Sequence, residues 1–523
     1  MKKALLIALA LGLIGAWSVP AMAIDWSARG GFTIENLYYK NIDYRSPVFV
    51  GGVPGANRFI SPPAAFSGPA FGLAGGNDPQ WNEDNWWLQM RGVIFIIARA
   101  SQDLVGVFGI EVNSTRWGDA DTSAALPGVG GGIAGRWNAD AVAIQVKSMY
   151  IDFKVPSLPV WFKAGIQPNQ LRNPVFLYAD AAGISARVKI DADPVLISIN
   201  PFWAVIRHGV ATLAGGTVPT DWTTADDGNL FGVDINAAIG LIKPGIFFAM
   251  ERQSQLYTGF PVPATGEGNK NLWWIGPYVD AKIGPVDATV DFVYNGGYDQ
   301  WDTGVPVITD PANPPPLNIS TPLLFSRRHE AWLLRGVVSY TTNKFKFGLG
   351  GLYGTGDNLS TPDKFEGYMV PFRSEATKFN DDFLILTGDW GMRQPFGVQT
   401  SGGLFKNWSA PGQGVWYVRG FADYQVTEWL KLKVNGGYIG DTSRGHAFET
   451  VGFRGGDEFG TDQEDDDSIG WELDAGVQIN IYQNLYLDSA FGYLIAGKAV
   501  AGQFGGSRAQ DPWLWLTSLT YVF

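Results

Sequence analysis

Cysteine is absent from this 523-residue chain, and charged residues make up only 17% of it. The lack of cysteine excludes a disulfide scaffold, Cys-ligated zinc, iron–sulfur clusters, thiol catalysis and covalently attached c-type haem. The charge that is present is acidic on balance, with a formal net charge of −12, which argues against a nucleic-acid binder. Intrinsic disorder is excluded because aromatic residues, at 14%, are plentiful.

Long hydrophobic runs are also lacking. Beyond the N-terminus, no stretch offers 18 uninterrupted apolar residues, so a protein that crosses a membrane by helices is excluded. The mean hydropathy is nevertheless close to zero, which is apolar for a secreted enzyme. Strands that alternate between a lipid-facing and a wet face average out to such a value.

Histidine is scarce, and catalytic motifs are missing. The three histidines, His208, His329 and His446, lie far apart in the sequence, and neither a G-x-S-x-G elbow nor an H-E-x-x-H motif is present. The sequence therefore predicts a protein that is not an enzyme.

The first 23 residues have the form of an export signal. Lys2 and Lys3 precede an apolar region over residues 4–17, and a small-x-small site ends at Ala23. We expect cleavage there, with a mature domain over residues 24–523, because the apolar run is short for a membrane anchor.

The remaining chain alternates with a period of two. Residues 183–191, 231–241, 286–294 and 471–481 each place apolar and polar side chains on opposite faces of an extended strand. Bulky apolar residues follow one face for 9 to 11 positions, the length of a membrane-spanning strand, whereas a soluble sandwich shows only the local pattern.

The predicted connections are alternately short and long. Short ones include residues 101–103, 156–159, 192–194, 284–285, 342–343 and 483–484; long ones include 41–84, 115–140, 298–328, 356–380 and 441–468. Short periplasmic turns and long extracellular loops are typical of an outer-membrane barrel. The fold class is therefore all-β: a single transmembrane antiparallel β-barrel of about 18 strands, with 16 to 20 allowed. Residues 383–390 and 397–406 form the weakest strand pair and are interpreted alternatively as part of a long loop.

Aromatic residues mark the strand ends and the C-terminus. The adjacent pairs Trp86-Trp87, Trp273-Trp274 and Trp416-Tyr417, and also Trp513 with Trp515, suit interfacial girdles, with core aromatics as the alternative. The last strand, over residues 512–523, ends in Phe. Its residues Trp515, Tyr521 and Phe523 resemble the C-terminal signal that the barrel-assembly machinery reads in bacterial outer-membrane proteins.

Several short motifs resemble those of alginate-export-type outer-membrane porins. They are GIQP at 165–168 with DAAGI at 180–184, SIGWELDAGV at 468–477, YQNLYL at 482–487 and FGYLIAGK at 491–498. The resemblance implies a monomeric outer-membrane barrel of roughly 18 strands, of which some members export an anionic polysaccharide. Such an exporter is expected to have a strongly cationic constriction, and this sequence departs from that expectation.

Strand parity assigns charged side chains to the face that lines the lumen. A charge there costs little free energy because it is in contact with water. Basic residues expected to line the pore are Arg91, Arg99, Arg187, Lys189, Lys282, Arg335, Lys346, Arg419, Lys431 and Lys433. Acidic ones are Asp191, Asp234, Glu251, Asp280, Asp287, Asp291, Asp423, Glu472, Asp474 and Asp488. Rows such as Arg187 with Lys189, and Glu472 with Asp474, are expected either to form opposed charged walls that orient a solute or to pair and be merely solvated.

Two loops are expected to narrow the pore, residues 298–328 and 356–380. An acidic loop also contains Asp462, Glu464, Asp465, Asp466 and Asp467, whose oxygens suit weak binding of Ca²⁺. The spacing does not fit an EF-hand, so a solvated loop near lipopolysaccharide is favoured over a metal site. No other cofactor is expected.

These observations predict a porin of the bacterial outer membrane. It would allow passive or facilitated diffusion of small hydrophilic solutes and ions, in contact with lipid and lipopolysaccharide, as a monomer or trimer. Two alternatives remain open: export of an anionic polysaccharide, and a barrel that serves as a sheath for a periplasmic or extracellular partner protein.

Overall fold

The strands of this chain form one closed sheet. The computed structural model describes residues 24–40, 84–116, 144–172, 174–207, 228–254, 269–303, 323–358, 361, 363–371, 374, 376, 382–388, 390, 392–393, 414–444, 467–497 and 511–523. The strands are β1 (Asp25–Lys40), β2 (Asp84–Ser101), β3 (Leu104–Arg116), β4 (Ile144–Lys154), β5 (Val160–Leu171), β6 (Leu177–Ala192), β7 (Val195–Arg207), β8 (Gly228–Ile239), β9 (Ile242–Ser254), β10 (Asn269–Ile283), β11 (Val286–Thr303), β12 (Leu323–Thr341), β13 (Phe345–Gly354), β14 (Lys364–Phe365), β15 (Val415–Gln425), β16 (Leu430–Asp441), β17 (Ser468–Tyr482), β18 (Leu485–Ala496) and β19 (Trp513–Val522).

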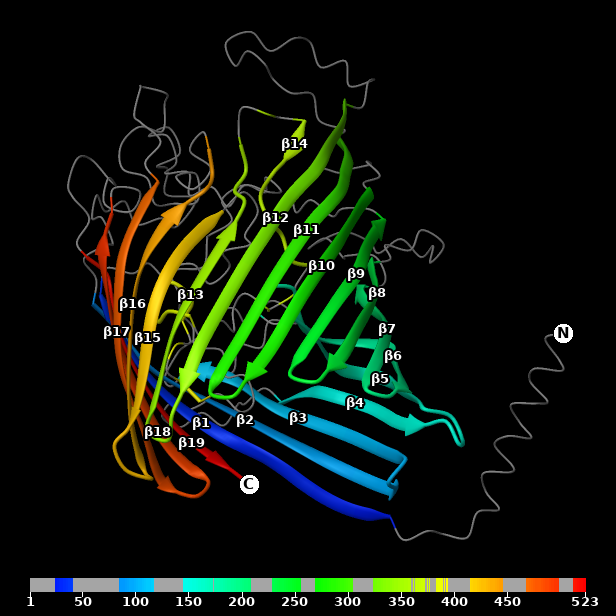
Figure 1. Cartoon of the computed structure of the whole chain (residues 1–523), viewed down its shortest axis with the longest axis horizontal. Coiled ribbons are helices and arrows are strands. Elements are labelled where there is room, and N and C mark those ends of the chain that lie inside the picture. Colours follow the sequence, from blue (N-terminus) through cyan, green and yellow to red (C-terminus); the bar gives the residue numbers. More distant parts are fainter. Residues whose placement is uncertain are drawn as a thin grey trace, which may run out of the picture.

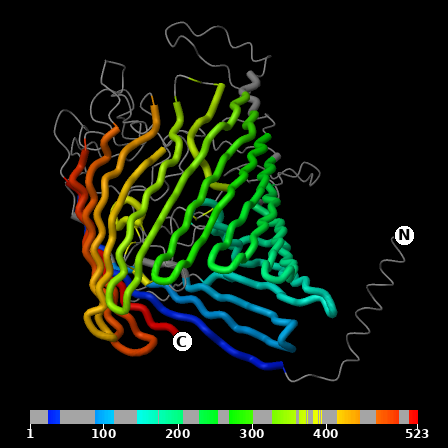
Figure 2. The backbone as a smooth tube through the Cα atoms, viewed as in Figure 1, coloured from blue at the N-terminus to red at the C-terminus, as the bar shows by residue number. Residues whose placement is uncertain are grey.

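Eighteen of these strands are long and pair antiparallel with both neighbours. β1 pairs with β2 on one side and with β19 on the other, so the sheet has no free edge. The exception, β14, has two residues and pairs parallel with β12. Figures 1 and 2 show the tilted strands running around a central space. The prediction of a barrel of about 18 strands is confirmed, and closure satisfies the backbone groups that lipid cannot.

Short turns join the strands at one end of the barrel, hereafter the turn end. Gly240 and Gly284 both adopt φ +58° in tight turns, a left-handed conformation that suits two-residue hairpins. The other end carries the long connections, with one exception between β5 and β6. Among the described residues, no helix is long and apolar enough to cross a membrane.

The outer face is apolar along the strands. Large side chains such as Trp26, Phe32 and Leu349 are exposed, whereas Glu35, whose position in β1 has the opposite parity, is fully buried on the inside. This inversion of a soluble protein's pattern is what a hydrocarbon solvent requires.

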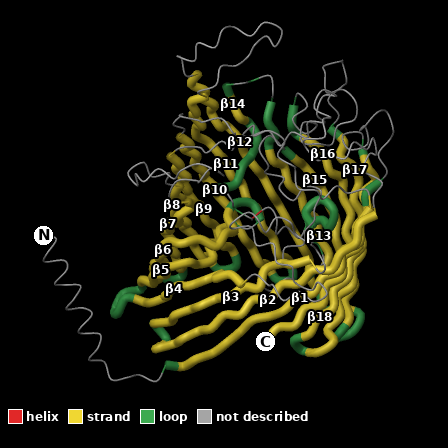
Figure 3. The backbone as a smooth tube through the Cα atoms, turned by 180° about the vertical axis from the view of Figure 1, so that it is seen from behind, coloured by secondary structure: helices red, strands yellow, loops and turns green. Residues whose placement is uncertain are grey.

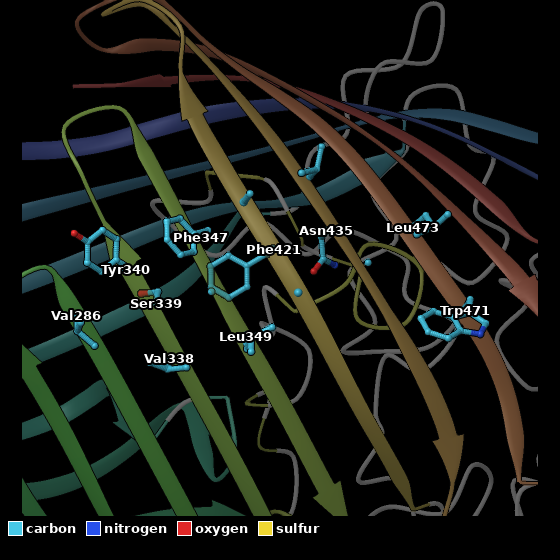
Figure 4. A pocket seen from close by; sticks show the side chains of 15 residues that line it. Val286, Val338, Ser339, Tyr340, Phe347, Leu349, Phe421, Asn435, Trp471 and Leu473 are labelled. Atoms are coloured by element: carbon cyan, nitrogen blue, oxygen red, sulfur yellow. The ribbon is translucent and has the colours of Figure 1, made fainter.

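A shallow trough of about 760 Å³ interrupts the outer face of β12–β17 (Figure 4). Gly420, Ala422 and Gly436 leave its floor low, and Leu349 and Leu473 flank it. The trough is apolar and continuous with the lipid-facing surface, so it suits contact with acyl chains.

The aromatic girdle prediction is wrong for the second member of two pairs. Trp274 and Tyr417 are buried inside the barrel, whereas Trp86 is 62% exposed on the outer face. Neighbouring residues in a strand point to opposite faces, so a pair cannot contribute both rings to one girdle.

The C-terminal residues complete the closure. Trp515, Tyr521 and Phe523 face outward and are 41–49% exposed. The backbone of Phe523 exchanges two hydrogen bonds with Gly30, of 2.9 and 3.0 Å, which extends the β1–β19 ladder. The predicted export signal over residues 1–23 lies outside the described residues.

Candidate functional site: the lumen

The inner face of the barrel carries every charged residue that parity assigned to it. Residues directly opposite each other in adjacent strands share a face, and the pairings carry one face around the barrel from Glu35 through Glu251 to Glu472. Arg91, Arg99, Arg187, Lys189, Lys282, Arg335, Lys346, Arg419, Lys431 and Lys433 lie on it, as do Asp191, Asp234, Asp280, Asp287, Asp291, Asp423, Asp474 and Asp488.

A segment between β13 and β15 fills part of the lumen (Figure 3). It comprises the described residues from Thr355 to Arg393 and is called the lumen segment below. β14 within it pairs with β12 at Arg328 and His329. Farther along, the indole Nε1 of Trp274 donates a 2.8 Å hydrogen bond to the carbonyl of Met369. The described residues of 356–380 contact the inner wall, and the expectation that they narrow the pore stays a prediction. The described residues of 383–390 belong to this segment and not to a strand.

The short connection between β5 and β6 joins the lumen segment. Tyr368 donates a 2.6 Å hydrogen bond to the carbonyl of Val175, and Ser374 donates one of 3.1 Å to that of Phe176. The ring of Phe176 packs against Phe247 at a centroid distance of 4.4 Å. The sequence analysis missed this contact, although two apolar residues in so short a connection were a usable signal.

Arg172 fixes this connection to strands β10 and β11. Its guanidinium lies 2.8 Å from Asp280 and 2.5 Å from Asp291, and stacks 4.0 Å from the ring centroid of Tyr278. Burial acts to lower the pKa of Arg172, but the hydrogen bonds and charges of the two carboxylates outweigh it and raise the pKa. Arg172 is therefore a permanent cation whose charge is neutralised.

Asp382 is the main polar anchor of the lumen segment. The carboxylate accepts hydrogen bonds from Arg335, at 3.1 Å, and from Arg419 and Tyr417. The amide of Asn435 donates to the Asp382 carbonyl at 2.9 Å. Burial acts to raise the pKa of Asp382, yet the two guanidinium charges outweigh it and hold the pKa well below its usual range.

Two further carboxylates of the wall receive the same segment. Glu472 accepts hydrogen bonds from the backbone N–H groups of Ile385 and Leu386. Asp488 binds the guanidinium of Arg393 at 2.5 Å and its backbone N–H at 2.9 Å. Around these contacts apolar side chains pack against the wall. The buried ones from the segment are Phe365, Tyr368, Val370, Ala376, Phe383, Leu384, Ile385, Leu386 and Trp390.

The prediction of a solvent-exposed acidic wall at Glu472 and Asp474 is wrong. Both residues face inward, but they are only 0% and 4% exposed because the lumen segment covers them. Strand parity predicts the face on which a residue lies. It cannot predict that a segment distant in the sequence will cover that residue. Arg335, Arg419 and Asp488 are covered in the same way and do not face open water.

Other predicted residues pair along the wall. Arg91 contacts Glu111 at 2.7 Å, Lys282 contacts Asp287 at 3.3 Å, and Lys270 contacts Glu251 at 3.0 Å. Asp234 accepts a 2.7 Å hydrogen bond from the hydroxyl of Tyr278.

Several predicted residues remain open to the lumen. Lys346 and Lys433 lie over the rings of Phe421 and Trp390, and Arg187 and Lys189 lie over that of Trp161. Within the described residues, Arg99, Asp191, Asp423 and Lys431 form no side-chain hydrogen bond, ion pair or ring contact.

The remaining predictions fall mostly outside the described residues. These include most of the loop over 298–328 and the acidic residues Asp462, Glu464, Asp465 and Asp466. Asp467 is exposed, and its carbonyl accepts a 2.9 Å hydrogen bond from the N–H of Asp441. In the part of the chain that the structure describes, no three potential metal ligands cluster.

His329 is a buried residue that packs between the wall and the lumen segment. It is 2% exposed, lies 2.8 Å from Asp299 and packs against Phe365 of β14 at a centroid distance of 4.9 Å. His208 and His446 lie outside the described residues.

Comparison with known proteins gives structural likenesses alone. No family model matches the chain, and no curated protein matches its sequence. Among solved structures, Acinetobacter baumannii OccAB2 has a TM-score of 0.45 and 11% identity, covering 95% of this chain and 98% of that one. Pseudomonas aeruginosa OccK8 (OprE) has a TM-score of 0.43 and 9% identity, and P. aeruginosa OpdK with vanillate 0.41 and 11%, both with 95% and 98% coverage. Likenesses of this size carry no argument about function, which is inferred below from this chain's own geometry.

Proposed function

We propose that this protein is an outer-membrane channel for passive or facilitated diffusion of small hydrophilic solutes and ions, not an enzyme. The observation that carries the proposal is a closed barrel of 18 long strands with an apolar outer face and a charged inner face. An eight-stranded barrel is filled by its own side chains, whereas a barrel of 16 to 18 strands leaves room for water.

The lumen segment supports a channel of restricted width. It is held by buried hydrogen bonds and ion pairs to β12, β15, β17 and β18, so it acts as a fixed constriction. A fixed constriction allows small solutes to pass and argues against passage of a wide polymer.

The export-signal pattern over residues 1–23 and the apolar outer face of the closed barrel support an outer-membrane location after cleavage near Ala23. Fractionation of cells that express the full chain tests this location. Recovery in the outer-membrane fraction as a heat-modifiable band supports it, and recovery in the inner membrane contradicts it.

The transport proposal is tested by swelling of proteoliposomes in sugars of increasing size. We expect swelling with mono- and disaccharides and a sharp loss with larger oligosaccharides, because the lumen segment narrows the pore. Vesicles with heat-denatured protein are the control. No swelling with any sugar would contradict the proposal and favour the sheath alternative.

Export of an anionic polysaccharide rests on the sequence motifs at 165–184 and 468–498 alone. It predicts passage of acidic oligosaccharides that are longer than the largest neutral sugar admitted. The same swelling assay, run with oligouronates, separates this alternative from a small-solute channel.

A further inference from the structure

Five cations on the inner wall of β1 and β4–β6 rest on aromatic rings. Their charged groups lie 5.0–5.7 Å from the ring centroids. The pairs are Arg29 with Phe95, Lys163 with Tyr150, and Lys154, Arg187 and Lys189 with Trp161. Within the described residues, none of the five has a carboxylate within 4 Å.

Many other cations on the inner wall are neutralised, although Lys346 and Lys433 also lie over rings. Arg91, Lys147, Lys270 and Arg335 each contact a carboxylate at 2.7–3.1 Å. The protein as a whole carries a formal net charge of −12, and two carboxylates share this arc of wall: Asp152 lies directly opposite Lys163, and Asp191 follows Lys189 on the same face. Neither forms an ion pair with the five cations within the described residues.

Trp161 organises the densest part of the arc. It lies in β5, directly opposite Lys154 of β4 and Arg187 of β6, so the three side chains form one row across three strands. Lys189 follows two residues after Arg187 on the same face. Each of the three charged groups lies within 5.5 Å of one ring centroid, so any two lie within twice that distance of each other.

An aromatic ring holds a cation without cancelling its charge. Cation–π attraction orders the long side chains, whereas a carboxylate partner would compete directly with an anionic solute. The cations keep their hydrogen-bond donors available, because a ring accepts none of them in the manner of a carboxylate oxygen.

A polar cavity of about 360 Å³ adjoins the row. Trp161, Lys163, Arg187, Ser185 and Asn200 contribute to its lining. The carboxylates of Asp152 and Asp234 line it as well, and Asp234 accepts hydrogen bonds from Asn200 and Tyr278. The cavity therefore offers two cations and neutral donors beside an aromatic ring, with Asp152 as a carboxylate opposite Lys163, at a size that suits a small solute.

We propose that Trp161 and the cations around it form an oxyanion-binding site on the channel wall, which takes the carboxylate or phosphate group of a small solute. This inference rests on the proposed channel function. Trp161 is a positioning residue: it spaces Lys154, Arg187 and Lys189 so that one oxyanion contacts two of them.

The test measures block of a chloride current by sodium phosphate and by sodium succinate, in planar bilayers that hold the refolded mature protein. The double variant Arg187→Gln with Lys189→Gln removes charge, and Trp161→Leu removes the ring but keeps the charges. Trp161→Phe is the conservative variant. Lys282→Gln is the matched control, because Lys282 faces the same lumen but is paired with Asp287.

We expect the half-blocking anion concentration to rise about tenfold in the double variant, since charge-assisted hydrogen bonds are the strong ones. Trp161→Leu should raise it about threefold, Trp161→Phe should restore most of the wild-type value, and Lys282→Gln should leave it unchanged. Block by phosphate alone, or by succinate alone, identifies which oxyanion the site takes.

The outcomes are separable from those of the proposed function. A wild-type protein that does not conduct overturns the channel proposal itself. A wild-type protein that conducts, with unaltered block in the double variant, overturns the oxyanion site. Should Trp161→Leu fail to refold, judged by its heat-modifiable mobility, the double variant still decides.

Discussion

Removal of the Asp382 charge is expected to release the lumen segment and enlarge the channel. In Asp382→Asn, the side chain keeps its shape but no longer neutralises Arg335 and Arg419. Both guanidiniums are largely buried, at 14% and 7% side-chain exposure. Loss of one partner from a buried ion pair costs about 3–5 kcal/mol, because the remaining charge is left without compensation.

This cost lowers the stability of the docked lumen segment and not the stability of the barrel. Each 1.4 kcal/mol shifts an equilibrium about tenfold, so the population of the docked segment relative to the released one should drop by about a hundredfold or more. The strands keep their ladder hydrogen bonds, so the melting temperature of the barrel should change little.

Single-channel recording in planar bilayers measures the effect. The variant should show larger conductance steps or frequent transitions to a larger step. Asp423→Asn is the matched control, because Asp423 is an inner-wall carboxylate of β15 that contacts no described residue of the lumen segment. Wild-type conductance in Asp382→Asn would refute the reasoning.

The same anchor sets a pH dependence. The pKa of Asp382 is depressed below its ordinary value of 3.8, so the ionised carboxylate stabilises the docked segment at pH values above about 4. This stabilisation is lost only as the pH falls through the depressed value. Conductance should therefore not respond to this group between about pH 5 and 8, and should rise only in stronger acid.

Four further outcomes are expected. Arg187→Glu should shift the reversal potential in a salt gradient toward cation selectivity without unfolding the barrel, and an unchanged potential would contradict its place on the water-filled wall. Tyr368→Phe leaves the Val175 carbonyl without its buried donor, which should weaken docking of the lumen segment by about 1–3 kcal/mol and appear as added open-channel noise; a quiet channel would count against that contact. Leu349→Arg places a charge on the lipid face and should lower the free energy of unfolding in vesicles by about 2–4 kcal/mol, whereas a neutral effect would place Leu349 away from the hydrocarbon. Mass spectrometry of the exported protein should give Ile24 as its first residue, and an intact residue 1 would show that the predicted signal is retained.

Strand parity predicted the barrel well, for a physical reason. A strand with lipid on one face and water on the other must alternate along its whole length, so residues such as Lys189 and Asp234 could be assigned to the inner face without a structure. The number of strands followed from the same pattern, combined with the short turns at one end.

The environment of those inner residues could not be predicted in the same way. Glu472 has the parity of a pore-lining carboxylate, but contacts with Ile385 and Leu386 bury it. Asp382 was not singled out, since it lies in a loop with no periodicity. Contacts between a loop and a wall depend on the path of the loop through the lumen, which no local pattern encodes.

The aromatic pairs show a different kind of failure. Trp274 and Tyr417 were assigned to interfacial girdles because they stand next to other aromatics. Strand parity, had it been applied to them, would have given the inner face, where they pack against the lumen segment. The two-residue alternation predicts the face of an aromatic residue better than does its position near other aromatics at a strand end.

The measurement that tests the account most directly is the single-channel conductance of the refolded mature protein in a planar bilayer, with its reversal potential in a salt gradient. A barrel narrowed by the lumen segment, with unpaired cations on its wall, predicts small stable steps and a reversal potential on the anion-selective side. A protein that inserts as a heat-modifiable barrel but passes no current would contradict the central claim that the lumen is an open, water-filled path.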